Sequence, residues 1–277
     1  MFVPQTALVR LAPLFRVAAS LVLLTVCVSC SNEGDSEQAG TPAEEPTAAE
    51  EPTATDDETA STKPDDPNAV LRHAVFFSFK EESSEEDVQG VADAFSALPS
   101  KIDAIIDYQW GTNNSPEGLD DGFTHCFFLT FADAAGRETY IPHPEHSGTF
   151  ADALRPHMKS VFVFDYWGTK QDKAIEKELK HAVFFKFKDD APVEGVVAVE
   201  EAFAALPSKI DTIKAFEWGT NNSPEGKNDG FTHCFMVTFD SEEGRATYID
   251  HADHRAFAGS LGPVLDKVRV LDFWGEK

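Results

Sequence analysis

Histidine and tyrosine occur at matching points in two stretches of this 277-residue chain, and both residue types can carry proton-transfer chemistry. These residues include His73, Tyr140 and His146 in the first stretch, and His181, Tyr248 and His254 in the second. An imidazole titrates near neutral pH, so it can abstract a proton beside a carbonyl group. A tyrosine hydroxyl can then stabilise the developing enolate oxygen by a hydrogen bond. The chemistry would be of the aldol or cyclisation type.

Four more histidines are candidates for ligand binding, namely His125, His143, His233 and His251. His143 and His146 also have the three-residue spacing of a metal pair, with Glu145 nearby, but a third ligand at a typical spacing is absent. The alternative is structural, since core histidines bond backbone groups and a buried tyrosine hydroxyl caps a carbonyl. We therefore predict no metal and no cofactor, and we leave catalysis and structure open.

These residues lie in two copies of one pattern, from His73 to Trp167 and from His181 to Trp274. Both copies contain His-Ala-Val-Phe-Phe, Leu-Pro-Ser-Lys-Ile-Asp, Trp-Gly-Thr-Asn-Asn-Ser-Pro-Glu-Gly and Phe-Thr-His-Cys-Phe. A repeat of this length can bury its own core, so it predicts two domains rather than a solenoid. We place them at residues 70–168 and 180–277, joined by a solvated connector at 169–179. Two similar domains suggest pseudo-twofold packing.

The apolar pattern predicts the elements of each copy. His73–Phe79 is apolar on both alternating faces, so this strand should be covered on both sides. Ser84 and Asp87 form a capping pattern for a helix that Pro99 ends. Asp133–Ile141 reads as a helix broken by Pro142 and Pro144, with a further short piece at Phe150–Leu154. The Asn-Asn-Ser-Pro-Glu-Gly stretch reads as a turn, and Asp165 and Asp272 as acceptors of backbone or lysine hydrogen bonds.

The resulting order is β-α-β-β-α-β in each copy, which predicts an α+β fold of two ferredoxin-like units with antiparallel sheets. One apolar sheet face in each unit is left uncovered by helices. The two units can press these faces together, as an intramolecular dimeric α/β barrel with the helices outside.

Several segments together resemble the stress-responsive A/B barrel (Dabb) family. They are His-Ala-Val-Phe-Phe-x-Phe-Lys, Trp-Gly-x-Asn, Gly-Phe-Thr-His, Tyr-Ile-x-His-x-x-His and the closing Asp before an aromatic residue. The resemblance covers both copies and implies a dimeric α+β barrel, here fused into one chain. It implies little about activity, because most members have no assigned reaction.

Similar plant proteins act as polyketide cyclases without a cofactor. They use a histidine of the first strand with the tyrosine and the last histidine of Tyr-Ile-x-His-x-x-His. Carried over by motif, the resemblance implies His73, Tyr140 and His146 as catalytic candidates in the first copy, and His181, Tyr248 and His254 in the second. Pro142 and Pro144 are replaced by Asp250 and Ala252 in the second copy, which leaves the equivalence of the two pockets open.

The N-terminal residues 1–30 predict export. Arg10 and Arg16 precede an apolar run, Val17–Val28, which is too short to span a bilayer and is followed by Ser29 and Cys30. This resembles a bacterial lipoprotein signal, so we expect lipidation at Cys30 and a place in the cell envelope. Simple secretion and an uncleaved anchor are the alternatives. Residues 31–69, rich in Glu, Asp, Thr, Ala and Pro, predict a disordered acidic linker.

Composition limits the partners. The formal net charge of −25 argues against nucleic acid and against direct adsorption to anionic lipid, so contact with a membrane would come only through the lipid anchor. Cys126 and Cys234 occupy equivalent positions and are expected as buried free thiols or as a bridge. We expect a monomer.

Three functions remain open. The first is an exported stress-associated module that binds a small apolar or aromatic carbonyl ligand. The second is a cofactor-independent cyclase or isomerase, and the third is a structural scaffold.

Overall fold

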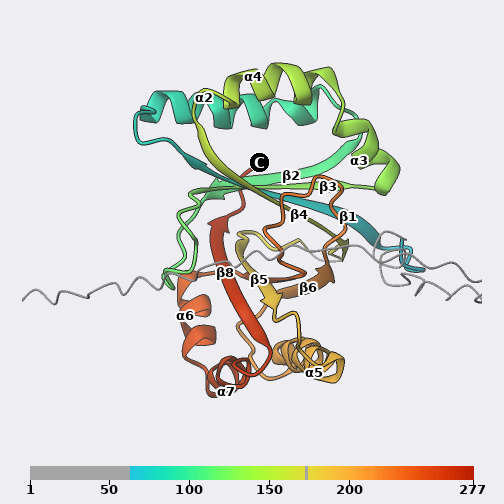
Figure 1. The fold of residues 1–277 in the computed structure, drawn as a ribbon, viewed down its shortest axis with the longest axis vertical. Coiled ribbons are helices and arrows are strands. Elements are labelled where there is room, and N and C mark those ends of the chain that lie inside the picture. The colour runs from blue at the N-terminus through green and yellow to red at the C-terminus, as the bar shows by residue number, and fades with distance from the viewer. Residues whose placement is uncertain (1–62, 172–173) are drawn as a thin grey trace, which may run out of the picture. The chain divides into compact units, whose positions relative to one another are not determined.

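The computed structural model describes residues 63–171 and 174–277, where each copy forms a four-stranded antiparallel sheet with helices (Figure 1). The first copy contains β1 (Ala69–Phe79), α2 (Glu85–Ser96), η1 (Leu98–Ser100), β2 (Ile105–Thr112), β3 (His125–Phe131), α3 (Ala134–Tyr140), η2 (Pro144–Phe150), α4 (Ala151–Leu154) and β4 (Met158–Thr169). The second contains β5 (Leu179–Phe187), α5 (Val193–Ala204), η3 (Leu206–Ser208), β6 (Ala215–Thr220), β7 (His233–Phe239), α6 (Glu242–Asp250), α7 (Ala252–Ser260) and β8 (Leu265–Trp274).

The two sheets have the same topology, with strand orders β2-β3-β1-β4 and β6-β7-β5-β8. This is the predicted ferredoxin-like arrangement, in which the first and third strands of each unit pair at the centre. The predicted signal peptide, Cys30 and linker residues 31–62 lie outside the described residues. Within the described ranges, no helix has the length and apolar character needed to span a membrane.

Local sequence explains where the first helix begins and ends. Ser84 accepts a hydrogen bond from the Asp87 backbone, and the Asp87 side chain accepts one from the Ser84 backbone, which completes a capping box. Pro99 then lies in a 3₁₀ turn, η1, that follows α2. The predicted capping pattern is confirmed.

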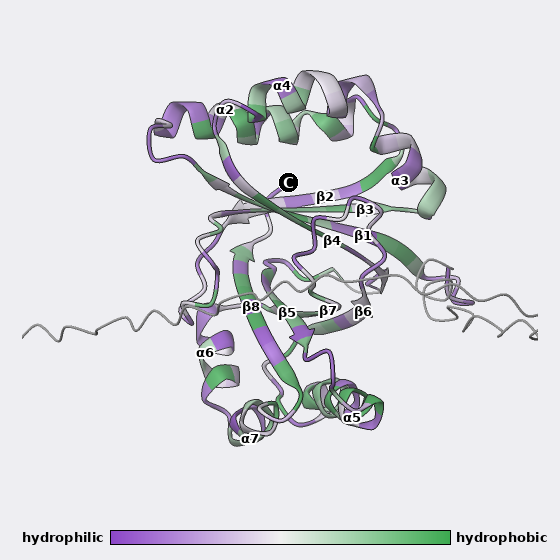
Figure 2. Cartoon of the chain, in the orientation of Figure 1, coloured by the Kyte–Doolittle hydropathy of each residue, from purple (hydrophilic) through white to green (hydrophobic). Residues whose placement is uncertain are grey.

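The central strand β1 is buried on both faces, as its pattern predicts. Val75 and Phe77 pack with Phe95 of α2 in the core between sheet and helices. Ala74 and Phe76 instead join the core between the two sheets. Figure 2 shows green, hydrophobic stretches along β1. The strand begins at Ala69, earlier than expected, because Leu71 pairs with both β3 and β4.

The core between the sheets is shared by the two copies. Phe76 and Phe162 of the first copy meet the Phe184 ring of the second at centroid distances of 5.3 and 4.9 Å. Cys126 and Cys234 lie in this core as buried free thiols. Each sheet therefore covers the apolar face of the other, which is the predicted intramolecular α+β barrel.

Two glycines allow the sheet edges to approach one another. A Cβ on Gly111 would collide with the Trp274 carbonyl oxygen. A Cβ on Gly219 would lie 3.0 Å from the Tyr166 side chain. Any larger residue would force these edges apart. The two glycines are therefore needed for close packing at both seams of the barrel, the lines along which an edge of one sheet meets an edge of the other.

The copies differ in the segment after the tyrosine helix. Pro144–Phe150 forms a π-helix, whereas the matching segment of the second copy is the regular α-helix α7. The distance between equivalent residues falls from 108 at His146 and His254 to 107 at Phe150 and Phe257, so the first copy carries one extra residue here. A single inserted residue is the usual origin of a π-turn. The helix α3 ends at Tyr140, so the predicted break after it is confirmed. The next helix begins at Pro144 rather than near Phe150, because a proline in the first turn lacks only a donor that would be unpaired anyway.

Candidate functional site

Each copy encloses a cavity between its sheet and its helices. The cavity beside His73 has a volume of about 220 Å³, and the cavity beside His181 about 310 Å³. Apolar side chains form most of the walls, including Phe77 and Val163 in the first and Phe185 and Val270 in the second. We call them the His73 cavity and the His181 cavity.

All six candidate catalytic residues line these cavities. His73, Tyr140 and His146 line the first, and His181, Tyr248 and His254 line the second. The ring centroids of His73 and Tyr140 are 5.4 Å apart, and those of Tyr140 and His146 are 4.2 Å apart. The second copy gives 5.5 and 4.3 Å.

A buried carboxylate orients the strand histidine. His73 Nδ1 lies 2.7 Å from Asp165 Oδ1, and the Arg137 guanidinium donates to Asp165 Oδ2 at 2.9 Å. Burial disfavours the charged imidazole, but the charge of Asp165 and its hydrogen bond outweigh burial and raise the pKa of His73. The raised pKa favours the charged form of His73, the imidazolium. The Nε2–H of this ring lies on the side away from Asp165.

The pKa of the second histidine is shifted in the opposite direction. His146 Nδ1 lies 2.9 Å from the Ile141 carbonyl oxygen, and a carbonyl can only accept, so Nδ1 carries the proton. Burial lowers the pKa of His146 despite this bond, so the ring is neutral near pH 7. Its Nε2 is then a free base. His254 repeats this arrangement with the Ile249 carbonyl at 3.1 Å, and burial also lowers its pKa.

The tyrosine hydroxyls are buried without a hydrogen-bond partner. Tyr140 and Tyr248 are both fully buried, and neither hydroxyl meets a donor or acceptor. Burial raises the pKa of both phenols, so both stay protonated and can donate. A buried unpaired hydroxyl costs stability, and a ligand oxygen in the cavity would satisfy it.

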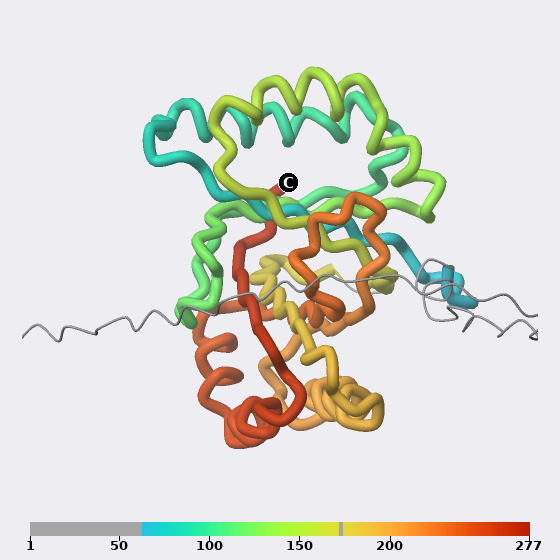
Figure 3. Tube along the Cα trace, viewed as in Figure 1, coloured from blue at the N-terminus to red at the C-terminus, as the bar shows by residue number. Residues whose placement is uncertain are grey.

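The Asn-Asn-Ser-Pro-Glu-Gly turn of each copy crosses to the site of the other. The Arg137 guanidinium donates to Asn222 Oδ1 at 2.8 Å, and Arg245 donates to Asn114 Oδ1 at 2.8 Å. The Asn222 backbone also donates to the Asp165 carbonyl at 2.8 Å. Figure 3 shows the loop after β2 extending toward α6 of the other copy. Neither site is complete within one copy.

The same loops bring a glutamate to each cavity. Glu225 of the second copy lines the His73 cavity, with Oε1 4.0 Å from His73 Nε2. Glu117 of the first copy lines the His181 cavity, with Oε1 3.9 Å from His181 Nε2. Glu117 Oε1 is buried without a partner, and burial raises the pKa of this carboxyl group.

The four remaining histidine candidates do not line either cavity. His125 Nδ1 contacts Thr124, and His233 contacts Thr232 and Glu200. His143 and His251 cap the helices η2 and α7, each accepting a backbone hydrogen bond through Nδ1. The ligand-binding role of these four histidines stays a prediction. Across residues 63–171 and 174–277, no group of three His, Cys, Asp or Glu side chains is arranged to hold a metal ion.

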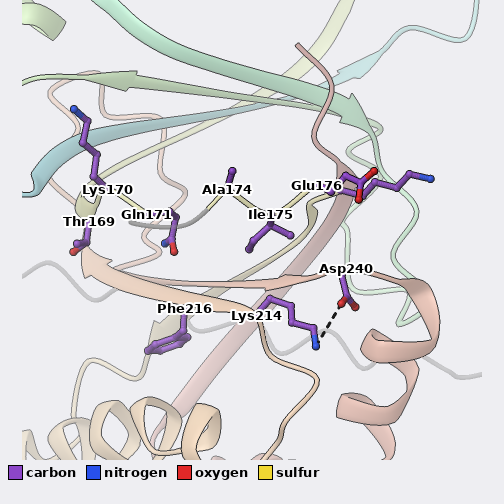
Figure 4. A pocket seen from close by; sticks show the side chains of 10 residues that line it. Thr169, Lys170, Gln171, Ala174, Ile175, Glu176, Lys214, Phe216 and Asp240 are labelled. Carbon is purple, nitrogen blue, oxygen red and sulfur yellow. Dashed lines mark ion pairs between the residues drawn. The ribbon is translucent and has the colours of Figure 1, made fainter.

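A larger surface hollow lies beside the connector between the copies (Figure 4). It measures about 1010 Å³ and is lined by residues such as Lys170, Phe216 and Asp240, with an ion pair of 3.4 Å between Lys214 and Asp240. It contains none of the histidines or tyrosines described above. The enclosed cavities, rather than this hollow, hold the groups that could act on a ligand.

Sequence reasoning missed several residues of the site. Arg137 and Arg245 were not singled out, and the two asparagine loops were read only as turns. Asp165 and Asp272 accept from histidine and arginine rather than from lysine. The available signal was the identical Asn-Asn-Ser-Pro-Glu-Gly in both copies, which is longer than a turn requires.

Fold and cavities together define a tandem α+β barrel with one histidine- and tyrosine-lined site in each half. Residues 71–168 and 179–274 both match the model of the stress responsive A/B barrel domain. The chain belongs to this family, in two copies.

Some known proteins are similar to one copy of the domain, and others to both copies together. A stress-response A/B barrel domain-containing protein of Arabidopsis thaliana is 38% identical over 95 residues, which is 34% of this chain and 83% of that protein. Olivetolic acid cyclase of Cannabis sativa is 29% identical over 97 residues, or 35% of this chain and 95% of the cyclase. A solved anthrone oxidase-like protein covers 78% of this chain and 94% of its own, with a TM-score of 0.54 and 11% identity. That last likeness concerns the fold alone.

Proposed function

We propose that this protein binds small, mostly apolar carbonyl compounds in its two cavities. The observation that carries the proposal is the pair of apolar cavities, each lined by a tyrosine whose hydroxyl has no hydrogen-bond partner among the described residues. Apolar walls with few placed polar groups are typical of small-molecule sites. The scaffold hypothesis expects no such cavity, so it is the weakest of the three.

Isothermal titration of the full chain with 2-acetylnaphthalene tests this proposal. We expect saturable binding that Tyr140→Phe and Tyr248→Phe together weaken by about 10-fold, the value of one hydrogen bond. Mass spectrometry of the purified protein would also identify a ligand that co-purifies. A chain that binds neither this ketone nor any co-purifying compound would contradict the proposal.

A second candidate is cofactor-independent acid–base catalysis in the same cavities. It is supported by the opposite pKa shifts of the two histidines, raised for His73 and lowered for His146, and by similarity to a cyclase. In this scheme His146 Nε2 removes a proton beside the ligand carbonyl, and the electron pair moves onto the carbonyl oxygen. The Tyr140 hydroxyl then stabilises the enolate oxygen by a hydrogen bond. The enolate carbon would then either take the proton back from His146 or attack a second carbonyl group. In the second case the oxygen of that carbonyl would take the proton from His146.

Hydrogen–deuterium exchange of the ketone methyl group, followed by NMR in D₂O, tests catalysis separately from binding. We expect the protein to accelerate exchange and His146→Gln with His254→Gln to abolish the acceleration. The rate should fall as the pH drops through the lowered pKa of these rings, because the base becomes protonated. His125→Gln is the matched control and should change nothing. If the ketone binds but its exchange is not accelerated, the result contradicts catalysis and supports binding only.

We also propose that the protein is exported and lipid-anchored at Cys30. The support is the short apolar run Val17–Val28 followed by Ser29 and Cys30. Mass spectrometry of membrane-extracted protein should find a lipid on Cys30, and Cys30→Ser should remove it. Because its two sheets already cover each other, the mature chain should be monomeric in light scattering. An unmodified Cys30 or a dimer would contradict the respective part.

A further inference from the structure

The two cavities differ in charge at their mouths, and we propose that they bind different classes of ligand. The His73 cavity takes an apolar ligand that carries a carboxylate, and the His181 cavity takes an uncharged one. The inference rests on the proposed binding function and adds to it the chemical class for each site.

Each mouth is formed partly by a loop of the other copy, and the backbone fixes that loop in the same way in both cases. The Val163 backbone of β4 donates to the Lys227 carbonyl at 3.0 Å, and the Val270 backbone of β8 donates to the Leu119 carbonyl at 3.0 Å. Both valines line their cavities. Lys227 and Leu119 are therefore equivalent positions, and the side chain there faces the cavity.

The side chains at these equivalent positions have different chemistry. The His73 cavity has Lys227 and Arg155 among its lining residues. The His181 cavity has Leu119 and Gly262 at the matching positions. Lys227 is 45% exposed in its side chain and Arg155 60%, so both cationic groups lie at the opening rather than in the depth.

The cations at the first mouth remain able to receive an anion. Lys227 Nζ lies 2.7 Å from Glu225 Oε2, and an ammonium group has three donors. Arg155 pairs with Asp152 through Nη1 and donates to the Ser147 carbonyl oxygen through Nη2 at 3.3 Å, and a guanidinium group has five N–H donors, so others remain to reach a ligand. A carboxylate at this opening would meet two cations while the apolar body of the ligand fills the cavity.

A carboxylate in the second cavity would have no such partner. Besides His181, whose charge is shared with Asp272, no lining residue of this cavity is cationic. Glu117 lines this cavity without the lysine that neutralises its counterpart Glu225 in the His73 cavity, and it would repel an anion when it is ionised. Burying a carboxylate without a counter-ion is costly, so this cavity favours an uncharged ligand.

The experiment uses the full chain with two probes of equal shape, 2-naphthoate and 2-acetylnaphthalene, in isothermal titration at pH 7.5. We expect one naphthoate per chain. Lys227→Leu should weaken naphthoate at least 10-fold and change the ketone less than 2-fold. Leu119→Lys should create a second naphthoate site. Lys214 lines neither cavity, so Lys214→Leu is the matched charge control. We expect it to leave the affinity for both probes unchanged.

Blocking variants assign each binding event to a cavity. Ala151 and Ala258 line the two cavities at equivalent positions, so Ala151→Trp should abolish naphthoate binding and Ala258→Trp should spare it. Unchanged melting temperatures would show that these variants fold. Naphthoate binding that survives Lys227→Leu, or that Ala258→Trp removes, would overturn the charge difference while leaving the binding function intact. If neither probe binds, the proposed function fails as well.

Discussion

The centres of the two sites are nearly identical, whereas the seams that join the two sheets are not. The histidine–aspartate distance is 2.7 Å in both copies, and the arginine and asparagine contacts recur. At one seam Arg72 bonds Glu217 of the other sheet at 3.0 Å, and the Tyr166 hydroxyl donates to the same carboxylate. We call this the Arg72 seam.

The equivalent seam uses different residues. Lys180, Gln109 and Phe273 stand where the first seam has Arg72, Glu217 and Tyr166. Lys180 and Gln109 both contact Glu178 of the connector, at 3.0 and 2.6 Å. The Glu178 side chain is 17% exposed, compared with 7% for Glu217. The site therefore requires one fixed geometry, whereas a seam needs only a partner for each buried charge.

The largest expected effect separates the two seams. Arg72→Met leaves the buried Glu217 carboxylate without its cation and should cost about 3–5 kcal/mol of unfolding free energy. Lys180→Met should cost less, about 1–3 kcal/mol, because Glu178 is more exposed than Glu217 and still accepts a hydrogen bond from Gln109. Urea denaturation of both variants measures the difference. Arg72→Met combined with Glu217→Met should recover most of the loss, and equal costs at the two seams would remove the distinction.

The second effect tests whether the two site centres are equivalent. The charge of Asp165 and of Asp272 outweighs burial and raises the pKa of His73 and His181, so folding binds protons on these rings. Their stabilisation is complete below about pH 6.5, the unfolded value, and is lost as the pH rises through the folded pKa. Each ring contributes a slope of at most about 1.4 kcal/mol per pH unit.

Denaturation at several pH values between 6 and 9 measures this slope. His73→Gln and His181→Gln should each remove an equal share of it. Unequal shares would show that the glutamates from the opposite loops, or Lys227, make the two centres electrostatically different.

The third effect concerns the unpaired hydroxyls. Tyr140→Phe and Tyr248→Phe remove a buried group that has no partner, so each should stabilise the ligand-free protein by about 1 kcal/mol. Thermal unfolding with and without 2-acetylnaphthalene measures both the gain and the weaker binding. Tyr108→Phe is the control, since its hydroxyl bonds Ser96 at 2.8 Å and its loss should destabilise. Destabilisation by either cavity variant would indicate a bonded hydroxyl.

The smallest effect compares the π-helix with its regular counterpart. Gly259 lies in α7 with open space around a Cβ, so Gly259→Ala should stabilise by about 0.5–1 kcal/mol. Gly148 has equal space but lies in the π-helix, where alanine gains less of its α-helical preference. Chemical denaturation resolves the two values. A larger gain at Gly148 would contradict this ranking.

Much of the fold could be predicted from local patterns. The burial of β1 on both faces and the capping box at Ser84 depend on neighbouring residues, and the structure has both. The π-helix could not be predicted, because one inserted residue can be absorbed as a loop, a bulge or a wider turn. The roles of Arg137 and Asn222 were equally hidden, since they meet only across the interface between copies.

The sequence by itself determined two ferredoxin-like units, their apolar faces and the histidines and tyrosines of each cavity. These follow from hydrophobic periodicity and repetition, which are properties of short segments. Only the tertiary structure decided that the loop carrying Asn114 and Glu117 completes the opposite site, and that Lys227 and Leu119 lie at different mouths. The physical reason is that burying the two sheet faces against each other fixes the crossing of the loops, and that packing joins residues far apart in the chain.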